Sequence, residues 1–347
     1  MKHLPRQIPL ACLIFACLAP AAAAQPKSGS PADALPSHIR RLTHFGERAD
    51  WSADGTRVLF LSKTFGDAME VEVKTGAIRN LTAHYPHFGY TRAHYLTSGD
   101  ILLVGPNAYD PKAPAKARWD CFGFLLPKGG AKPAVPLGIR INEGPAVSRR
   151  TPTIAWAEWS EPTLENGGNA GSIVYTGEID TRGPTPKMAN VRPVLASADL
   201  QQPCTLEPQN FRPPQDEELI VSVYSEVGRK CDVAGVALAT RRVIRYTDSQ
   251  PVYDEPEGIF PDGRSTLVEC DSQNLQGPGS IDLWQLQLDG SGDYRRLTYF
   301  SEYPSYKASN GAVSDDGRHI AFQLGKSGEA AGVGHGLFLF NLQAVSN

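Results

Sequence analysis

The chain has 347 residues, of which 41% are hydrophobic and 20% are charged, and its formal net charge is −3. This length and composition are those of a globular protein with one large domain or two medium ones. Lysine and arginine are spread along the chain without a basic stripe, which argues against a nucleic-acid partner. No segment after the N-terminus reaches the roughly 18 apolar residues of a membrane-spanning helix.

The first 24 residues have the three parts of a secretory signal peptide. Lys2 and Arg6 form a basic start, an apolar run of about a dozen residues follows, and a small-residue stretch ends at Ala24. We expect cleavage after Ala24, which takes the net charge from −3 to about −5 and gives a periplasmic or secreted protein. The alternative is a lipoprotein signal at Cys17, which the bulky Phe15 fits poorly.

Residues 25–36 are rich in Pro, Ser and Ala and are predicted to be a flexible lead-in. The next segment, "IRRLT" at residues 39–43, is a predicted strand. Almost the same segment, "YRRLT", returns at residues 294–298. Internal similarity of this kind indicates a repeat architecture.

Three stretches share the order strand, Asp-Gly turn, strand: residues 51–62, 260–270 and 313–324. Asp-Gly favours a tight hairpin because glycine adopts positive φ without steric cost. Two of these units continue with a second hairpin that ends in Leu-Thr, at residues 68–82 and 281–298. One repeat unit is therefore predicted to be four antiparallel strands.

The first turns of six such units fall near residues 54, 99, 150, 215, 262 and 316. This spacing predicts an all-β fold, a six-bladed β-propeller of four-stranded antiparallel blades over residues 37–347. The last unit, residues 307–342, contains only three strands. We expect the strand at residues 39–43 to be its fourth, so that the N-terminal strand closes the ring and removes free sheet edges.

The stretches "WSADGTRVLFLS", "FPDG" and "SDDGRHIAFQ", with strands that end in "LT", resemble the TolB-type (WD-repeat-like) β-propeller family. The resemblance extends over residues 38–342 and is clearest in the first blade and the last two. It implies an exported six-bladed propeller. It does not imply one function, because such propellers serve as binding platforms, accessory domains and enzymes. The separate N-terminal domain of TolB has no counterpart here, so a role in the Tol system is not implied.

In each predicted blade we label the strands a to d from the axis outward. The a–b and c–d turns then share one face, and they are short. The b–c loops and the d–a crossovers share the other face, and they are longer and richer in functional side chains. Loops on a rigid scaffold commonly carry binding residues, so we expect the site at the channel mouth on this second face.

The candidate residues on that face come from both ends of the chain, which ring closure would bring together. The catalytic candidates are His84, Arg92 and Lys307. The binding candidates are His44, His87, Glu255, Glu257, Asn310 and His335. Glutamates also recur at the start of the middle blades, at Glu143 and Glu207, where the alternative is a structural ion pair with an inner-strand arginine.

The main functional hypothesis is a binding platform for a protein or a glycan. The alternative is an enzyme that cleaves an acidic polysaccharide or oligosaccharide by β-elimination, since a base beside a cation is what uronate lyase chemistry needs. No cofactor is expected, and a divalent metal only under the lyase alternative, with His84 and His87 as candidate ligands. No nucleotide-binding glycine loop and no GxSxG motif occurs, which excludes the corresponding chemistries.

Four cysteines follow the signal stretch: Cys121, Cys204, Cys231 and Cys270. In an exported protein they permit two disulfides, and buried free thiols are the alternative. Trp156 and Trp159 are expected to be packing residues rather than a sugar-binding platform.

Overall fold

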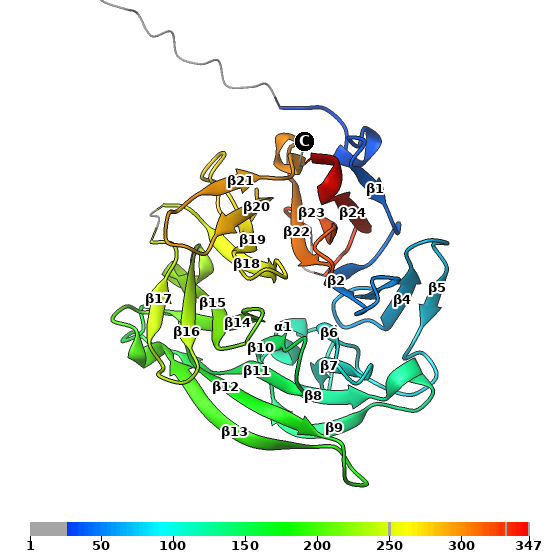
Figure 1. Ribbon diagram of the computed structural model, residues 1–347, viewed down its shortest axis with the longest axis vertical. Helices are drawn as coiled ribbons and strands as arrows, with labels where there is room; N and C mark the ends of the chain where they lie inside the picture. Colours follow the sequence, from blue (N-terminus) through cyan, green and yellow to red (C-terminus); the bar gives the residue numbers. More distant parts are fainter. Residues whose placement is uncertain (1–25, 249–250, 330–331, 346–347) are drawn as a thin grey trace, which may run out of the picture.

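The computed structural model describes residues 26–248, 251–329 and 332–345. Six four-stranded antiparallel sheets are arranged as a ring (Figure 1), which confirms the six-bladed propeller. The predicted signal peptide, including Cys17, lies outside the described residues. Within the described part of the chain, no helix is long and apolar enough to cross a membrane.

Each blade runs from an inner strand to an outer one. Blade 1 consists of β2 (Glu47–Trp51), β3 (Arg57–Leu61), β4 (Ala68–Glu72) and β5 (Ile78–Asn80). Blade 2 consists of β6 (Arg92–Tyr95), β7 (Ile101–Pro106), β8 (Cys121–Leu126) and β9 (Val135–Arg140). Blade 3 consists of β10 (Glu143–Val147), β11 (Thr153–Pro162), β12 (Ala170–Asp180) and β13 (Lys187–Ala196). Blade 4 consists of β14 (Thr205–Phe211), β15 (Glu218–Ser225), β16 (Lys230–Ala237) and β17 (Val243–Arg245). Blade 5 consists of β18 (Asp254–Ile259), β19 (Ser265–Cys270), β20 (Asp282–Gln287) and β21 (Tyr294–Arg296). Blade 6 consists of β22 (Tyr306–Val313), β23 (His319–Lys326), β24 (Leu337–Asn341) and β1 (Ile39–Arg41).

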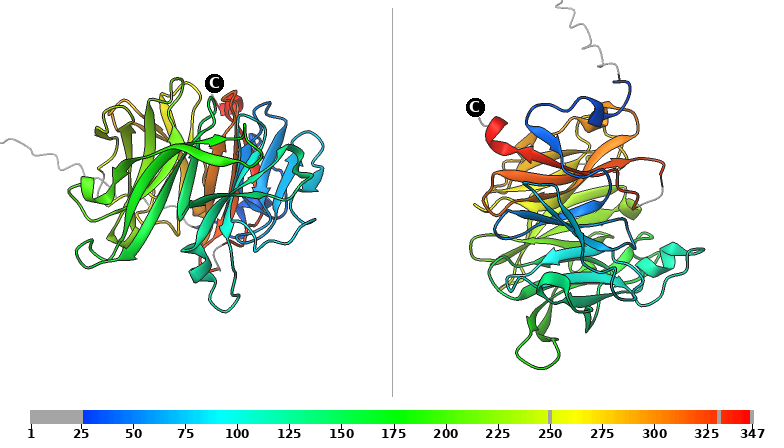
Figure 2. Two further views of the ribbon diagram at one scale, coloured as in Figure 1. Left: turned by 90° about the horizontal axis from the view of Figure 1, so that it is seen from below. Right: turned by 90° about the vertical axis from the view of Figure 1, so that its right-hand side faces the viewer.

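The helical elements are short. They are α1 (Pro114–Arg118) and the 3-10 turns η1 (Pro31–Asp33), η2 (Lys128–Gly130), η3 (Ser197–Asp199), η4 (Glu226–Gly228), η5 (Phe300–Glu302) and η6 (Leu342–Val345). The loop that carries α1, between β7 and β8, projects beyond the ring in the side views (Figure 2).

All six predicted a–b turns are present between the first and second strands of the blades. Four of them contain a glycine at positive φ, namely Gly55, Gly99, Gly263 and Gly317, with φ between +66° and +82°. A side chain is disfavoured in this backbone conformation, which is why these hairpin positions can be read from the sequence.

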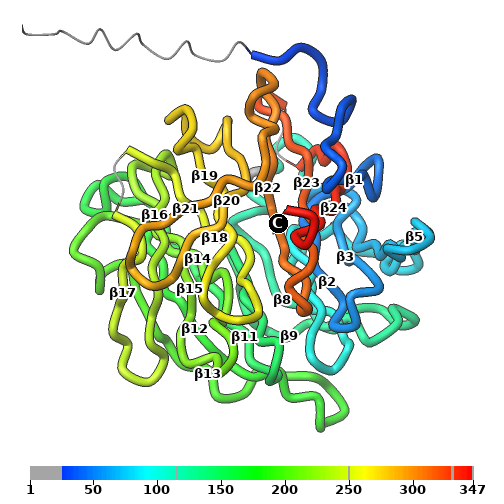
Figure 3. Tube along the Cα trace, turned by 45° about the horizontal axis from the view of Figure 1, so that its top comes forward, coloured from blue at the N-terminus to red at the C-terminus, as the bar shows by residue number. Residues whose placement is uncertain are grey.

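In blade 6 the N-terminal strand β1 pairs with β24, with Ile39 opposite Phe340 and Arg41 opposite Phe338 (Figure 3). The segment predicted to be a flexible lead-in contains η1, and Leu35 packs against the core between blades 5 and 6. Lys27 also forms an ion pair with Glu302 at 2.7 Å.

The threonine of the repeated Leu-Thr has the same structural role in blades 6, 1 and 5, and Thr247, which follows Tyr246, has it in blade 4. The threonine follows the outermost strand, is buried, and its Oγ1 accepts a hydrogen bond from the backbone N–H near the start of the third strand. The pairs are Thr43 with Leu337 (2.9 Å), Thr82 with Ala68 (3.1 Å), Thr247 with Val233 (2.9 Å) and Thr298 with Leu283 (2.9 Å). The repeated segment therefore fastens the outer edge of a blade.

Apolar side chains form a core between each pair of neighbouring blades, six in all, and a smaller cluster around Cys231 lies between blades 4 and 5. Between blades 6 and 1, for example, Trp51 and Phe60 pack with Leu337 and Leu339. The second strands are consequently buried on both faces, and β7 and β19 contain no exposed residue. Cys121, Cys204, Cys231 and Cys270 are buried in these layers as free thiols, so none of them forms a disulfide.

Candidate ligand-binding site

A cavity of about 720 Å³ lies on the face formed by the b–c loops and the d–a crossovers, the face that the sequence predicts. Its lining comes from the starts of inner strands, the ends of second strands and the b–c loops. The charged and aromatic lining residues are Glu47, Arg48, Arg92, Arg118, Trp119, Glu143, Trp159, Glu207, Tyr224, Tyr253, Glu255, Glu257, Glu269, Lys307, Lys326 and Glu329. All six blades contribute to it.

Bulges in the inner strands help to turn these side chains toward the axis. The pairing register shifts within β2, β10, β14, β18 and β22. Arg48 and Asn310 lie at two of these bulges with positive φ, +58° and +47°. Such bulges bend a strand and redirect its side chains, and they are frequent beside functional sites.

The cationic part of the cavity is formed by Arg92 from β6 and Arg118 from α1, which both bond Glu143. Arg118 Nη2 donates to Glu143 Oε1 at 2.6 Å, and Arg92 Nη2 also donates to this oxygen. Burial favours the neutral form of the Glu143 carboxyl, but Arg118, Arg92 and Arg48 outweigh it and lower its pKa to about 2. Glu143 is therefore an ionised, paired carboxylate.

Next to this pair, beginning at Glu207, the cavity contains carboxyls linked through tyrosine hydroxyls. The Tyr224 hydroxyl lies 2.7 Å from Glu207 Oε2 and 2.5 Å from Glu255 Oε1, and the Tyr253 hydroxyl donates to Glu255 Oε2. Burial and the nearby Glu143 raise the pKa of Glu207 to about 7. Burial and Glu269 raise the pKa of Glu255 to about 7 as well.

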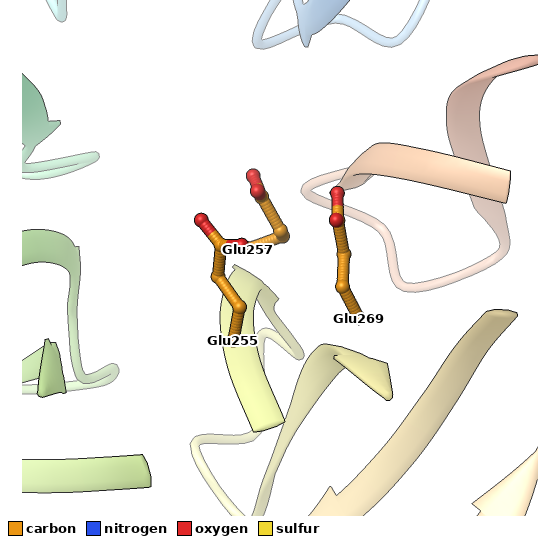
Figure 4. Close-up of side chains that lie close together, drawn as sticks. All are labelled: Glu255, Glu257 and Glu269. Atoms are coloured by element: carbon orange, nitrogen blue, oxygen red, sulfur yellow. The ribbon is translucent and has the colours of Figure 1, made fainter. Parts of the chain in front are cut away.

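Glu257 and Glu269 extend this acidic part, and burial raises the pKa of both carboxyls. One oxygen from each of Glu255, Glu257 and Glu269 lies within 4.8 Å of the other two, and all three side chains project into the same space (Figure 4). Across residues 26–345 as far as they are described, this is the one group of three acidic, histidine or cysteine side chains with metal-ligand spacing.

Two tryptophans form an apolar part of the wall. Trp119 follows α1, Trp159 lies on β11, and their rings meet edge to face with centroids 5.7 Å apart. Asn142 holds the two segments together, because its Nδ2 donates to the Trp119 carbonyl at 2.8 Å and its Oδ1 accepts from the Trp159 N–H at 2.8 Å. Trp156 is a buried packing residue, as expected, whereas Trp159 also lines the cavity.

A second cavity, of about 270 Å³, lies at the other end of the ring axis beside the a–b turns. The residues that line both cavities are Arg48, Arg92, Glu207, Glu257 and Asn310. These polar residues therefore form the boundary between the two ends of one central channel.

The structure brings five of the nine predicted site residues to the larger cavity: Arg92, Glu255, Glu257, Lys307 and Asn310. Lys307 Nζ donates to the Pro278 carbonyl at 2.9 Å. Asn310 Nδ2 donates to Glu257 Oε1 at 3.1 Å. Predicted residues from blades 2, 5 and 6 thus lie at one cavity.

The four predicted histidines are not among the lining residues of this cavity. His44 and His84 are exposed on the crossovers. His87 Nε2 lies 3.0 Å from Asp67 and its Nδ1 accepts the Gly89 N–H at 2.9 Å, so both ring nitrogens are engaged. His335 Nε2 lies 2.6 Å from Glu329. This geometry does not support a metal site at His84 and His87.

Several lining residues were missed in the sequence, notably Glu47, Arg118, Trp119, Tyr224 and Glu269. Tyr224 lies near the end of the second strand β15, and Glu269 lies near the end of the second strand β19. Arg118 and Trp119 belong to the insertion between β7 and β8. Second strands read as apolar runs, so an isolated Tyr or Glu near their ends was the available signal. For Arg118 and Trp119 the signal was the unusual length of the b–c loop in blade 2.

No family model matches this chain, and no curated protein matches its sequence. Solved structures do match. A Mycobacterium tuberculosis puromycin-hydrolyzing peptidase shares 14% identity over 80% of this chain, with a TM-score of 0.51, and the match spans 40% of that peptidase. An oligogalacturonate lyase from Vibrio parahaemolyticus shares 12% identity over 88% of this chain and 79% of its own, with a TM-score of 0.52.

TolB from Acinetobacter baumannii shares 16% identity over 82% of this chain and 64% of its own, with a TM-score of 0.44. At such identities a likeness establishes a shared fold and no activity. The chain is a β-propeller with TolB-like proteins among its structural neighbours. The narrower TolB-type assignment stays a prediction.

Proposed function

We propose that this protein binds a carbohydrate in the larger cavity. The observation that supports this function is the combination of a tryptophan pair on one wall with hydrogen-bonding charged groups on the others. A volume of about 720 Å³ suits a small ligand or a chain end, whereas a protein partner needs a broad surface. A sugar offers apolar C–H faces to aromatic rings and hydroxyls to carboxylates and guanidinium groups.

The test is a titration with neutral and uronate oligosaccharides, followed by calorimetry and tryptophan fluorescence. We expect saturable binding that Trp119→Ala or Trp159→Ala weakens at least 10-fold. The matched control is Trp284→Ala, since Trp284 lies on β20 and does not line the cavity. Melting temperatures of all variants separate lost binding from lost folding. Binding that is unchanged in both wall variants would contradict the proposal.

A second candidate function is β-elimination on an acidic oligosaccharide. It is favoured by Glu207, whose pKa is raised to about 7 while its Oε1 lies 3.4 Å from Arg92 Nη2. A carboxylate with a near-neutral pKa can take a proton, and a neighbouring cation can neutralise the substrate's acid group. The likeness to an oligogalacturonate lyase supports the shared fold only.

This activity would appear as growing ultraviolet absorbance of an unsaturated product from oligogalacturonate. Glu207→Gln should abolish the turnover and leave oligosaccharide binding in place. Turnover that survives in Glu207→Gln would exclude Glu207 as the base. Absence of turnover in the wild-type protein, together with retained binding, would leave the binding function alone.

We also expect export, with the mature chain beginning near Gln25, which intact-mass measurement tests.

A further inference from the structure

One tyrosine hydroxyl joins two carboxyls of the larger cavity that belong to neighbouring blades. The Tyr224 hydroxyl lies 2.7 Å from Glu207 Oε2 in blade 4 and 2.5 Å from Glu255 Oε1 in blade 5, and both are hydrogen-bond distances. Tyr224 lies on β15 directly opposite Thr205, two residues before Glu207 on β14. Tyr224 and Glu207 are therefore diagonal neighbours on one face of blade 4. We refer to Glu207, Tyr224 and Glu255 as the tyrosine bridge.

The number of protons in the tyrosine bridge follows from the chemistry of its members. A tyrosine hydroxyl has one proton, and an ionised carboxylate only accepts hydrogen bonds. If Glu207 and Glu255 were both ionised, Tyr224 could donate to one of them, and its oxygen would lie against an oxygen of the other with no proton between the two. One carboxyl must therefore carry a proton and donate it to the Tyr224 oxygen. The bridge thus holds one proton more than two ionised carboxylates and a hydroxyl would hold.

The outer contacts of the tyrosine bridge are compatible with either position of this proton. The Tyr253 hydroxyl donates to Glu255 Oε2, which can accept whether or not Glu255 is ionised. The Gly144 N–H donates to Glu207 Oε1 at 3.2 Å, and Arg92 Nη2 lies 3.4 Å from the same oxygen. The proton moves from one carboxyl to the other when the bridging hydroxyl accepts it and passes on its own. The two carboxyls therefore titrate as a pair.

Charged and titratable groups from several elements face the tyrosine bridge. They are Arg92 on β6, Arg118 on α1, Glu143 on β10, Cys231 on β16, Tyr253, Glu257 on β18, Glu269 on β19 and Lys307 on β22. Burial raises the pKa of Glu207 and of Glu255, each to about 7. The neighbouring carboxylates act in the same direction, and the neighbouring cations oppose the shift without reversing it. The extra proton is therefore held up to neutral pH.

The tyrosine bridge faces the space in which a carbohydrate would bind, since all three of its residues line the larger cavity. The carboxylate of an acidic sugar brings a negative charge into that space. Such a ligand favours the protonated bridge, because a nearby like charge disfavours ionisation of a carboxyl. Loss of the proton at higher pH therefore repels an acidic sugar, whereas a neutral sugar has no charge to be repelled.

We propose that Glu207, Tyr224 and Glu255 share one proton, and that the larger cavity consequently binds an acidic sugar together with that proton. Tyr224 and Glu255 are then specificity-determining residues, since the protonated bridge accepts acidic sugars and the deprotonated bridge discriminates against them. The effect on binding rests on the proposed carbohydrate function. The shared proton does not, because it can be measured in the ligand-free protein.

The first measurement is difference infrared spectroscopy of the full mature protein without ligand, because a protonated carboxyl has a C=O band that an ionised one lacks. In the wild-type protein, a carboxyl band should be lost as the pH rises through about 7. Glu255→Gln should remove this titration, because its amide can donate to Tyr224 and does not ionise. Tyr224→Phe keeps the ring and should move the midpoint by at least about 0.5 pH unit, since a hydrogen bond is lost.

The matched control for this measurement is Glu329→Gln, at the outer part of the same cavity beside His335. This variant should retain the wild-type titration. A wild-type protein without a carboxyl titration near pH 7, or a titration that Glu255→Gln leaves unchanged, would overturn the proposal.

The second measurement is calorimetry with uronate and neutral oligosaccharides of equal length, at pH about 6 and about 8. The wild-type protein should bind the uronate at least about 10-fold more weakly at the higher pH, and binding there should take up about one proton. Its affinity for the neutral sugar should change less than about 2-fold. In Glu255→Gln the affinity for the uronate should be the same at both pH values.

The outcomes separate the proton-linked specificity from the carbohydrate function on which it rests. Uronate affinity that is equal at both pH values in the wild-type protein would overturn the specificity. Absence of binding by every oligosaccharide would contradict the carbohydrate function and with it the effect on binding, while the infrared titration and its loss in Glu255→Gln would still establish the shared proton.

Discussion

Two glutamates in neighbouring blades, Glu143 and Glu207, show how position decides the chemistry of one residue type. Both are buried at the start of an inner strand. Arg118 and Arg92 surround Glu143 and overcome the effect of burial, so the pKa of Glu143 falls to about 2. Burial dominates at Glu207, and the ionised Glu143 beside it raises its pKa to about 7. The cavity therefore holds a fixed anion next to a carboxyl that can exchange a proton.

His94, at the other cavity, gives a pH-dependent prediction for stability. The Nε2 of His94 is buried, and burial lowers the pKa of His94 to about 4. The positive charges of Arg149, Arg92 and Arg48 also lower this pKa, whereas the negative charge of Asp50 opposes the change. Between pH about 6.5 and 4 the unfolded state binds this proton and the folded state does not. The free energy of unfolding should therefore fall as the pH falls through this range, and His94 should not contribute above it.

The measurement is urea unfolding of the wild-type protein and His94→Gln from pH 7 to pH 4.5. The variant should lose less stability than the wild-type protein over this range, because glutamine does not titrate. His84→Gln, which removes an exposed histidine, is the control. Wild-type and His94→Gln curves that run parallel would contradict the prediction.

At this scale the sequence predicts acidic residues better than histidines. Glu255 and Glu257 lie in an inner-strand segment, "DEPEG", whose repeated pattern fixes its distance from the axis, so their place in the cavity follows from the fold. His84 and His87 lie within a long crossover, whose path depends on local contacts such as Asp67 with His87. A repeat pattern contains no information about such contacts.

At the scale of the strand, the Leu-Thr segment shows which hydrogen bonds the repeated sequence provides. In blade 5, Thr298 Oγ1 donates to Asp282 Oδ1 at 2.8 Å and accepts the Leu283 N–H at 2.9 Å. Asp282 also accepts from the Phe300 N–H at 2.7 Å and from Arg296 at 2.7 Å. One threonine thus completes the hydrogen bonds of a strand edge and a buried carboxylate.

Thr298→Val should therefore lower the free energy of unfolding by about 1–3 kcal/mol, because it leaves a buried N–H and a buried carboxylate oxygen without this partner. Valine has nearly the same shape, so lost packing should contribute little. Denaturant unfolding measures the change. The control is Thr185→Val, at an exposed position in the loop between β12 and β13, which should change stability by less than about 0.5 kcal/mol. Equal effects at the two positions would contradict the proposed role.

The strands and hairpins of blades 1, 5 and 6 could be predicted because Asp-Gly and Leu-Thr mark fixed points in them, and the turns of the middle blades followed from the spacing. The insertion with α1 could not, because it interrupts the repeat in blade 2 with a sequence that has no counterpart in the other blades. The two residues that it delivers to the cavity, Arg118 and Trp119, were accordingly missed. Insertions into a repeat carry much of its specificity, and pattern analysis is least informative there.

At the scale of the whole molecule, blade 6 joins segments from the two ends of the described chain. Deletion of residues 37–45 should remove β1 and Thr43 and leave β24 as an exposed edge. Ile39, which is 5% exposed in the core between blades 5 and 6, would also be lost. We expect a lower melting temperature, a lower soluble yield and more aggregation, measured by thermal unfolding and light scattering.

The comparison is deletion of residues 25–36, which removes η1, the packing of Leu35 and the Lys27–Glu302 pair. These contacts are smaller, so this truncation should cost measurably less stability than the first. If both truncations are equally stable, β1 does not support the ring.

The direction of β1 against β24 has a mechanical consequence. Ile39 begins β1 and pairs with Phe340 near the end of β24. The N-terminal end of β1 and the C-terminal end of β24 therefore lie side by side. Tension between those ends pulls the hydrogen bonds apart one at a time, as in a zipper, rather than sharing the load among all of them. A stretched molecule would therefore open at this seam, peeling β1 away while blades 1 to 5 still bear no load.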